Sequence, residues 1–352
     1  MRIALLISTE HRESDVTEAA AALRPMPDYL ALSDALVRAG YQVALIDRAE
    51  AQRTLSPRAL ALARRAGPDL PQAIVAMRRR REYDCFVCDS EGIGIPLAAL
   101  LRTRGAPNGV FLIAHRMTAR TKQALWRSLR LEKQVAGAFC YADTQLECMR
   151  ELGFALNRLH RMPFHADHRF YAPSGIPKER MVLSVGQEQR DYASLIAAAS
   201  SLRCPVRVLA SSPWSRFQGR GAPSQLPPNV SFLKRVSYLE LRDLYARAAV
   251  VAVPVEPVDF QAGITSLLEA MAMATPVVAT ANPGLREVFA DGEAGIWVPP
   301  RDQAALATAI DYLLRHPREA AEMGRRGRAL IERGMTLDHW VARITRAVLQ
   351  AP

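Results

Sequence analysis

The sequence lacks any long hydrophobic run. None of its apolar stretches approaches a length of about 18 residues, which a membrane-spanning helix requires. The short apolar segment in MRIALLISTEHRE is soon ended by charged residues, which is typical of a first strand and not of a signal peptide. These features predict a cytoplasmic protein.

Cysteine is also scarce. The chain has 5 cysteines in 352 residues, an odd number without the spacing of a disulfide framework, which indicates reduced thiols. Cys85 and Cys88 lie in the strand-like stretch DCFVCD, where residues three apart point to opposite faces. They therefore cannot bind one ion together, and we expect no metal site.

Acidic residues are too few to balance the basic ones. The net charge is +11, nearly all of the positive charge is arginine, and the composition (49% hydrophobic, 23% charged) is typical of a folded soluble protein. Such charge favours anionic partners such as nucleotide phosphates, anionic lipid or nucleic acid, although it could also reflect genomic composition. No helix-turn-helix, zinc or aromatic-basic stacking motif accompanies it, so we expect no nucleic-acid partner.

Short apolar runs typical of strands alternate with longer helical patterns. Before residue 145 the runs are RIALLIS, QVALID, DCFVCD, GVFLIAH and GAFCYA, and after residue 180 they are MVLSVG, VRVLAS, VSFLK, VVAVPV, PVVAT and GIWVPP. This alternation predicts parallel sheets covered by helices on both faces, which is the doubly wound α/β class.

The two sets of runs are separated by DHRFYAPSGIPKER, which is rich in proline, glycine and charge and is typical of a linker. The chain is long enough for two domains. We therefore expect two Rossmann-like domains, 1–170 and 178–335, that face a central cleft. Residues 336–352 are expected to form a C-terminal helix that could pack back on the first domain.

The segment EPVDFQAGITSLLEAMAMA combines a turn with the start of a helix, which we expect to begin at Thr265 or Ser266. A strand, a bend near Gly263 and a helix together present backbone N–H groups and the positive end of a helix dipole to an anion. Glu269 has two interpretations. It either completes a capping box with Ser266, three residues earlier, or it serves a ligand.

The stretch ITSLLEAMAMATPVVATANPGLREVFADGEAGIWVPPRDQAALATAI resembles the donor-binding half of retaining glycosyltransferases of family 4, which have the GT-B architecture. The likeness covers about residues 180–335 well and the first domain only in outline. It implies that Glu269 binds the ribose of a nucleotide diphosphate sugar, and it implies neither a bound metal nor a further cofactor. It also implies that a continuous segment contacts the sugar donor, namely Gln261, Ala262, Gly263, Ile264, Thr265 and Ser266.

This chain departs from the family at Gln261, where a second glutamate usually meets the hydroxyls of the transferred sugar. A neutral hydrogen bond is about half as strong as a charge-assisted one. The departure therefore implies a different donor sugar or a weaker grip on the usual one. Glu256 and Asp259 are close enough in sequence to supply a carboxylate instead.

A second stretch, VLSVGQEQRDYASLIAAA, ends a strand at Gly186 and starts a helix near Asp191. Where the family places an arginine and then a lysine at the donor phosphates, this chain has Gln187 and Arg190. We expect Arg190 to bind phosphate, because its guanidinium can do so bidentately. The alternative is a solvated arginine at a helix start, which the helix dipole disfavours.

Three more candidates follow strands. The resemblance implies that His115, at the end of GVFLIAHRM, faces the donor sugar, although a structural histidine is the alternative. Glu91, in CDSEGIGIPLAALL, is expected to be exposed before a helix that begins near Pro96, and it is a candidate on the acceptor side. The nucleobase should lie against the backbone near Val236, and Trp214 could stack on it.

The helical pattern RMTARTKQALWRSLRLEKQ places Arg116, Arg120, Arg127 and Arg130 in one narrow sector, with Trp126 nearby. This face could associate peripherally with the inner face of an anionic membrane. The alternative is a solvated face on a basic protein.

Taken together, the resemblance implies a retaining, hexosyltransferase-type glycosyltransferase that moves a sugar from a nucleotide diphosphate sugar to an unidentified acceptor. The acceptor could be a glycan, a lipid-linked molecule or a small molecule. Gln261 and Gln187 leave open a non-catalytic sugar-nucleotide-binding protein. A sugar-nucleotide epimerase of the same fold is the other alternative, but it would need a set of acidic and histidine residues that the sequence does not supply.

Overall fold

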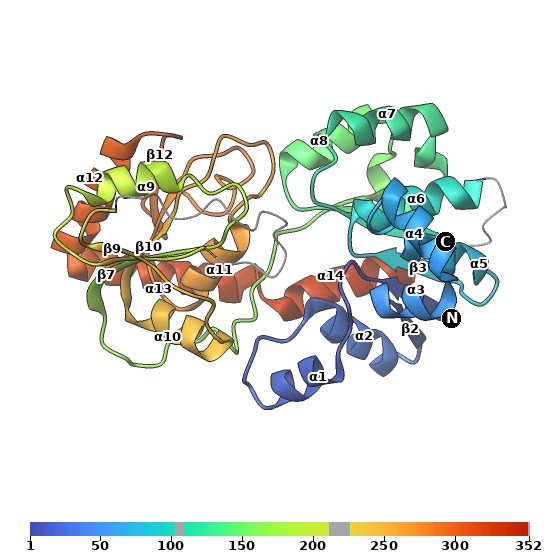
Figure 1. Ribbon diagram of the computed structural model, residues 1–352, viewed down its shortest axis with the longest axis horizontal. Coiled ribbons are helices and arrows are strands. Elements are labelled where there is room, and N and C mark those ends of the chain that lie inside the picture. The colour runs from blue at the N-terminus through green and yellow to red at the C-terminus, as the bar shows by residue number, and fades with distance from the viewer. Residues whose placement is uncertain (103–108, 211–225, 351–352) are drawn as a thin grey trace. The chain divides into compact units, whose positions relative to one another are not determined.

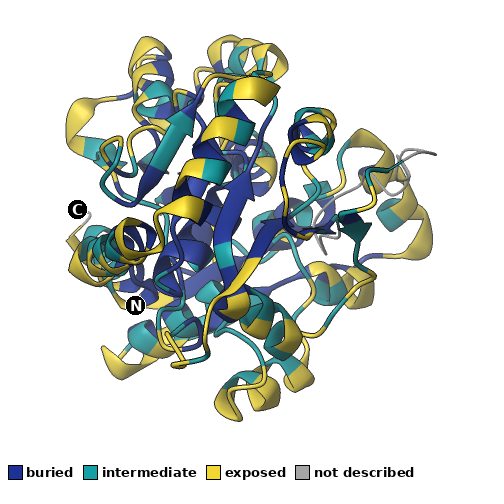
Figure 2. Ribbon diagram, turned by 90° about the vertical axis from the view of Figure 1, so that its left-hand side faces the viewer, coloured by how far each residue is buried: buried dark blue, intermediate teal, exposed yellow. Residues whose placement is uncertain are grey.

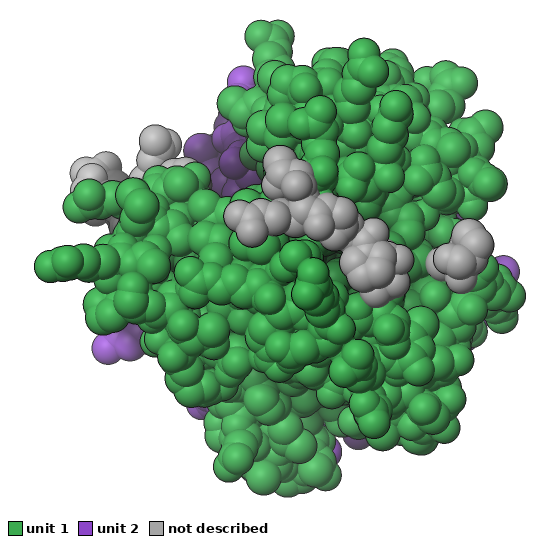
Figure 3. Space-filling view, turned by 90° about the vertical axis from the view of Figure 1, so that its right-hand side faces the viewer, with its two compact units in different colours: residues 1–21, 26–162, 338–352 green, residues 22–25, 163–337 purple. Residues whose placement is uncertain are grey.

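The structure is a computed structural model that describes residues 1–102, 109–210 and 226–350 (Figure 1). Its contacts divide the chain into two units, which are coloured separately in Figure 3. Unit 1 contains residues 1–21, 26–162 and 338–352, and unit 2 contains residues 22–25 and 163–337. Among the described residues, no helix is long and apolar enough to cross a membrane.

Unit 1 is built on a six-stranded parallel sheet in the order β2-β1-β3-β4-β5-β6. Its strands are β1 (Arg2–Leu6), β2 (Gln42–Ile46), β3 (Cys85–Cys88), β4 (Val110–Ala114), β5 (Val135–Cys140) and β6 (Leu159–Arg161). Its helices are α1 (Glu13–Ala20), α2 (Asp28–Arg38), α3 (Arg48–Thr54), α4 (Pro57–Ala66), α5 (Leu70–Arg78), α6 (Glu91–Arg102), α7 (Arg120–Leu129), α8 (Asp143–Glu151) and most of α14 (Leu337–Gln350), with short 3₁₀ turns at Leu131–Lys133 and Leu156–Arg158.

Unit 2 repeats this plan with a six-stranded parallel sheet in the order β12-β11-β10-β7-β8-β9. Its strands are β7 (Glu179–Val185), β8 (Val206–Leu209), β9 (Val230–Phe232), β10 (Ala248–Val253), β11 (Val277–Thr280) and β12 (Gly295–Val298). Its helices are α9 (Tyr192–Ala199), α10 (Tyr238–Arg247), α11 (Ile264–Ala272), α12 (Gln303–Arg315) and α13 (Pro317–Gly334). The prediction of two doubly wound α/β units is therefore confirmed.

The central strands are mostly apolar because helices cover both faces of each sheet. Every residue of β4, VFLIA, is buried. In unit 2, Val182 and Leu183 of β7 contribute to different hydrophobic clusters, as expected for neighbours on opposite faces of a sheet. Figure 2 shows the result, with the strands largely dark blue and the outer faces of the helices yellow.

Each sheet contains one point where the strand order changes direction. In unit 1, β1 pairs with β2 on one side and with β3 on the other. In unit 2, β7 pairs with β8 on one side and with β10 on the other. Open α/β sheets bind their ligands outside the carboxyl ends of the strands at such switch points. These two edges are therefore where a site is expected.

The arginine-rich stretch does not form the single helix that the sequence predicts. Helix α7 ends at Leu129, Arg130 adopts a left-handed conformation (φ 48°) and a short 3₁₀ turn follows. Trp126 is 0% exposed and packs beside Phe154 in the core of unit 1, with 6.0 Å between the ring centroids. Trp126 therefore cannot contact a membrane, and membrane association through the exposed arginines stays a prediction.

Candidate functional site

The turn before α11 depends on Gly263. This residue is the N-cap of α11 with a φ of 88°, so the helix begins at Ile264 and not at Thr265 or Ser266 as predicted. A Cβ at this position would lie 2.9 Å from Val253 Cγ1. Glycine alone therefore fits both the conformation and the space.

This helix start leaves backbone donors without acceptors. The first helical hydrogen bond runs from Leu267 N to Gly263 O (3.1 Å), and Ile264 N donates to Gln261 O (3.3 Å). Within the described parts of the chain, the N–H groups of Thr265 and Ser266 have no acceptor. They stand at the positive end of the helix dipole, where an anion is stabilised by about 0.3–1 kcal/mol.

The capping-box interpretation of Ser266 and Glu269 is wrong. Ser266 Oγ donates to Val185 O (3.0 Å) and accepts from Arg190 Nη2 (2.8 Å), so it does not cap the helix. Glu269 Oε2 instead accepts a hydrogen bond from the hydroxyl of Tyr245 (2.8 Å). Its carboxylate is thus held by a side chain from the end of α10.

Burial dominates the electrostatics of Glu269. It raises the pKa of this carboxyl from 4.5 to about 7, against the hydrogen bond from Tyr245 and the charge of Arg190, which lower it. The ring of Tyr245 is itself buried and meets Tyr171 edge to face at 5.9 Å. Sequence reasoning missed both tyrosines, because neither lies at a spacing from Glu269 that marks it.

Arg190 is not a solvated arginine at a helix start. Its Nε and Nη2 donate to Val185 O (3.0 and 2.9 Å), Nη1 donates to Glu188 O (3.1 Å) and Nη2 also donates to Ser266 Oγ. Burial lowers the pKa of this guanidinium. The group lies against Gly186, where a Cβ would be 2.3 Å from Nη2, and its Nη1 is 3.2 Å from the Cβ position of Gly263.

The remaining unit 2 candidates lie around this edge. Gln261 Nε2 donates to Gly284 O (2.9 Å), so its amide is tied to the loop after β11. Glu256 is bonded to both Nε and Nη2 of Arg301 (3.1 and 2.9 Å), and it is therefore not a free substitute for the missing glutamate. Val236 is half-buried just before α10, while Trp214 lies outside the described residues.

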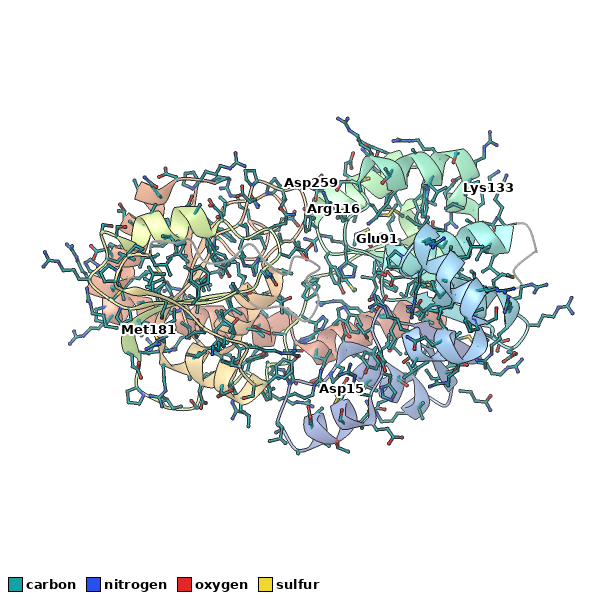
Figure 4. The ribbon with its side chains drawn as sticks, in the orientation of Figure 1. Asp15, Glu91, Arg116, Lys133, Met181 and Asp259 are labelled. Carbon is teal, nitrogen blue, oxygen red and sulfur yellow. The ribbon has the colours of Figure 1, made fainter. Side chains whose placement is uncertain are left out.

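In unit 1 the predicted environment of Glu91 is wrong. This residue is 4% exposed and is the first residue of α6, with Pro96 inside the helix. Its carboxylate accepts from the backbone N–H groups of His115 and Arg116 (3.0 Å each) and from Lys122 Nζ (2.6 Å). Burial alone would raise the pKa of Glu91, but His115 and Lys122 hold it below its ordinary value. Glu91 is thus a buried anchor for the turn after β4, and Figure 4 labels it together with Arg116.

His115 is exposed at the carboxyl end of β4. Its Nε2 lies 3.0 Å from Asp89 O, at the end of β3, and its ring is 5.2 Å from that of Tyr141, at the end of β5. The structure therefore brings His115 and Glu91 together at the edge of unit 1, and it gathers Gly186, Arg190 and the start of α11 at the edge of unit 2. In the described ranges, no three histidine, cysteine, aspartate or glutamate side chains are arranged to hold a metal ion.

Part of unit 2 matches known proteins in sequence. The family model "Glycosyl transferases group 1" matches residues 218–330. A D-inositol 3-phosphate glycosyltransferase from Frankia alni is 45% identical over 92 residues, which are 26% of this chain and only 22% of that relative's length.

Solved structures match over nearly the whole chain. A sucrose-phosphate synthase from Thermosynechococcus elongatus has a TM-score of 0.74 at 18% identity, and Anabaena HepE in complex with UDP and glucose has a TM-score of 0.70 at 14% identity. Each match covers 99% of both chains. Identities this low establish the fold alone. The chain therefore carries a glycosyl transferases group 1 region in its second unit, set in a two-domain GT-B fold.

Proposed function

We propose that this chain is a glycosyltransferase whose unit 2 holds a nucleotide diphosphate sugar. The observation that carries the proposal is the double use of α11. The helix offers the N–H groups of Thr265 and Ser266 at its start and the carboxylate of Glu269 three residues further on. Three residues correspond to about 4.5 Å along a helix axis, which suits a diphosphate followed by a ribose.

Arg190 can add a charged donor to this site without losing its present contacts. A guanidinium has five N–H groups, and four of them are accounted for by Val185, Glu188 and Ser266. In the described parts of the chain, one Nη1–H is left, on the side of Gly263. Donors fixed in advance around a leaving diphosphate stabilise the charge that develops as the glycosidic bond breaks.

The finer features of the reaction are part of the same proposal. Retention of anomeric configuration and independence from metal follow from the family resemblance. Because the HepE structure is a complex with UDP and glucose, and the Frankia relative is named for an inositol phosphate, UDP-glucose and polyol acceptors are the first substrates to test. The acceptor itself is open.

A binding screen followed by an assay tests the proposal. UDP, GDP and ADP, each with and without an attached sugar, are screened by thermal shift. Nucleotides with one of the three bases should raise the melting temperature, and the others should not. The matching sugar nucleotide should then release its diphosphate in the presence of an acceptor, and the coupling of the anomeric proton in the product gives the configuration.

Two results would contradict the proposal in different ways. If no nucleotide raised the melting temperature, unit 2 would not be a nucleotide site. If a sugar nucleotide bound but its diphosphate was never released with any acceptor tried, the chain would be a binding protein, as Gln261 and Gln187 allow.

A further inference from the structure

The switch point of unit 1 contains polar atoms that no protein group satisfies. In the described residues, Asp89 Oδ1, Ser90 Oγ and Gln72 Oε1 are all buried without a hydrogen-bond partner. Leaving such a group unpaired destabilises the fold, and native proteins contain few of them. Two of them directly follow β3, and the third, on α5, lies beside the end of β1, so together they indicate a missing partner.

The surrounding contacts fix these groups in place. The N–H and the hydroxyl of Ser8 both donate to Asp89 Oδ2 (2.6 and 2.8 Å), which occupies one carboxylate oxygen and leaves the other. Gln72, which is 0% exposed, donates its Nε2 to Ile7 O (3.3 Å), next to Ser8. Strands β1 and β3 pair directly up to Leu6 and Cys88, so these residues meet where both strands end.

The unsatisfied atoms select the chemistry of a partner. A carboxylate oxygen and an amide oxygen can only accept hydrogen bonds, and a hydroxyl can donate or accept. The partner must therefore offer hydrogen-bond donors or positive charge. Hydroxyl groups of a sugar or polyol do so, whereas an ionised phosphate only accepts and would be repelled by Asp89.

Asp89 is suited to this task near neutral pH. Burial raises the pKa of its carboxyl to about 6, and the two hydrogen bonds from Ser8 limit the rise. Among nearby charges, Asp28 raises this pKa and His115 lowers it. The carboxyl is therefore ionised, and purely an acceptor, above that pH.

We propose that the carboxyl ends of β1 and β3 bind an uncharged, hydroxyl-rich part of the acceptor, with Asp89 Oδ1 accepting a hydrogen bond from one of its hydroxyls. Ser90 and Gln72 line the same edge and favour a second hydroxyl. That the bound polyol is an acceptor rests on the proposed glycosyl transfer, whereas the binding of a polyol by unit 1 does not.

Saturation-transfer NMR with myo-inositol and glucose tests the site directly, with inorganic phosphate as a competitor. We expect wild type to bind at least one of the two polyols, phosphate not to displace it, and Asp89→Ala to weaken the affinity at least tenfold. Asp89→Asn should weaken it less. In wild type, but not in Asp89→Asn, affinity should fall as the pH drops through about 6.

Asp84→Ala is the matched control. Asp84 lies just before β3, at its other end, and its Oδ2 accepts from Arg2 N of β1 (2.7 Å), as Asp89 does from Ser8. This variant loses a comparable tie between the same two strands but should bind polyols like wild type. If Asp89→Ala does not fold, Ser90→Ala, which removes no strand contact, should still weaken binding severalfold.

Three results would overturn the proposal. They are wild type that binds neither polyol, Asp89→Ala that binds as tightly as wild type, and Asp84→Ala that loses as much affinity as Asp89→Ala. In each case the atoms would instead be satisfied by buried water. UDP binding, measured on the same samples, reports on unit 2 separately. If wild type did not bind UDP, the proposed nucleotide site would be wrong, while the result for the polyol would still hold.

Discussion

The two sheets have similar switch points that offer opposite chemistry. In unit 2, the edge of β7 and β10 presents donors, namely the amides at the start of α11 and Arg190. In unit 1, the edge of β1 and β3 presents acceptors, with Asp89 Oδ1 foremost. Topology thus favours a ligand site at each edge, and the residues there suit an anion in unit 2 and a hydroxyl-bearing group in unit 1.

The two glutamates beside these edges, Glu91 and Glu269, differ in how far the protein itself satisfies their carboxylates. Glu91 is surrounded by two amides and Lys122, which hold its pKa below the ordinary value. Glu269 has the Tyr245 hydroxyl as its hydrogen-bond donor, and burial raises its pKa to about 7. The first carboxylate is fully used by the protein, while the second gains from a ligand that brings further donors.

The largest expected effect comes from distorting the turn that presents the donors of unit 2. Gly263→Ala adds strain at a φ of 88° and a contact of 2.9 Å with Val253. Strain costs about 1–3 kcal/mol and overpacking about the same, so we expect a loss of about 2–6 kcal/mol in unfolding free energy and no stabilisation by UDP. Gly292→Ala is the control, because its φ is 77° with no atom within 4 Å of the added Cβ. Equal losses in the two variants would remove the special role of Gly263.

Next in size is the loss of the unit 2 carboxylate. Glu269→Gln should weaken UDP binding by about 1.5–3 kcal/mol, which is typical of a charged hydrogen bond. Glu91→Gln, in the other unit, should lower the melting temperature without changing the Kd for UDP measured by calorimetry. The comparison of the two edges would fail if Glu91→Gln were the variant that lost UDP.

The pH dependence of stability should reveal the raised pKa of Glu269. Because the folded pKa of Glu269 is raised from 4.5 to about 7, the folded state holds a proton that the unfolded state has lost. Stability should therefore fall as pH rises from about 4.5 to 7 and then level off. Urea titrations of wild type and Glu269→Gln across this range check it, and identical pH profiles would contradict the assignment.

The smallest effect is expected at Gln261. Gln261→Glu places a carboxylate against Gly284 O, where an amide now donates at 2.9 Å, and this should cost about 1–3 kcal/mol. If Gln261 also faces the transferred sugar, the affinity for a panel of sugar nucleotides should change more than that for the free diphosphate. A uniform loss across the panel would limit Gln261 to holding the loop after β11.

Local sequence patterns predicted the fold much more completely than they predicted the contacts of the candidate site. Strand–helix alternation was visible in sequence, because it depends on neighbours within one element. The stretch predicted as a linker instead lies within unit 2, where Phe170 and Tyr171 are buried. The contact of Ser8 with Asp89 joins residues 81 apart, and that of Arg190 with Ser266 joins residues 76 apart. The same is true of Glu91, whose burial requires Lys122, 31 residues away. No spacing rule encodes such pairs.

The last helix has a consequence for synthesis. Residues 338–352 belong to unit 1, and Trp340 Nε1 donates to the hydroxyl of Tyr141 (2.8 Å) after the chain has passed through all of unit 2. Domains usually fold in the order in which the ribosome releases them. Here the unit that begins the chain still lacks a helix when residues 163–337 are already complete. The second unit can therefore fold first, and the first unit stays incomplete until α14 has been synthesised.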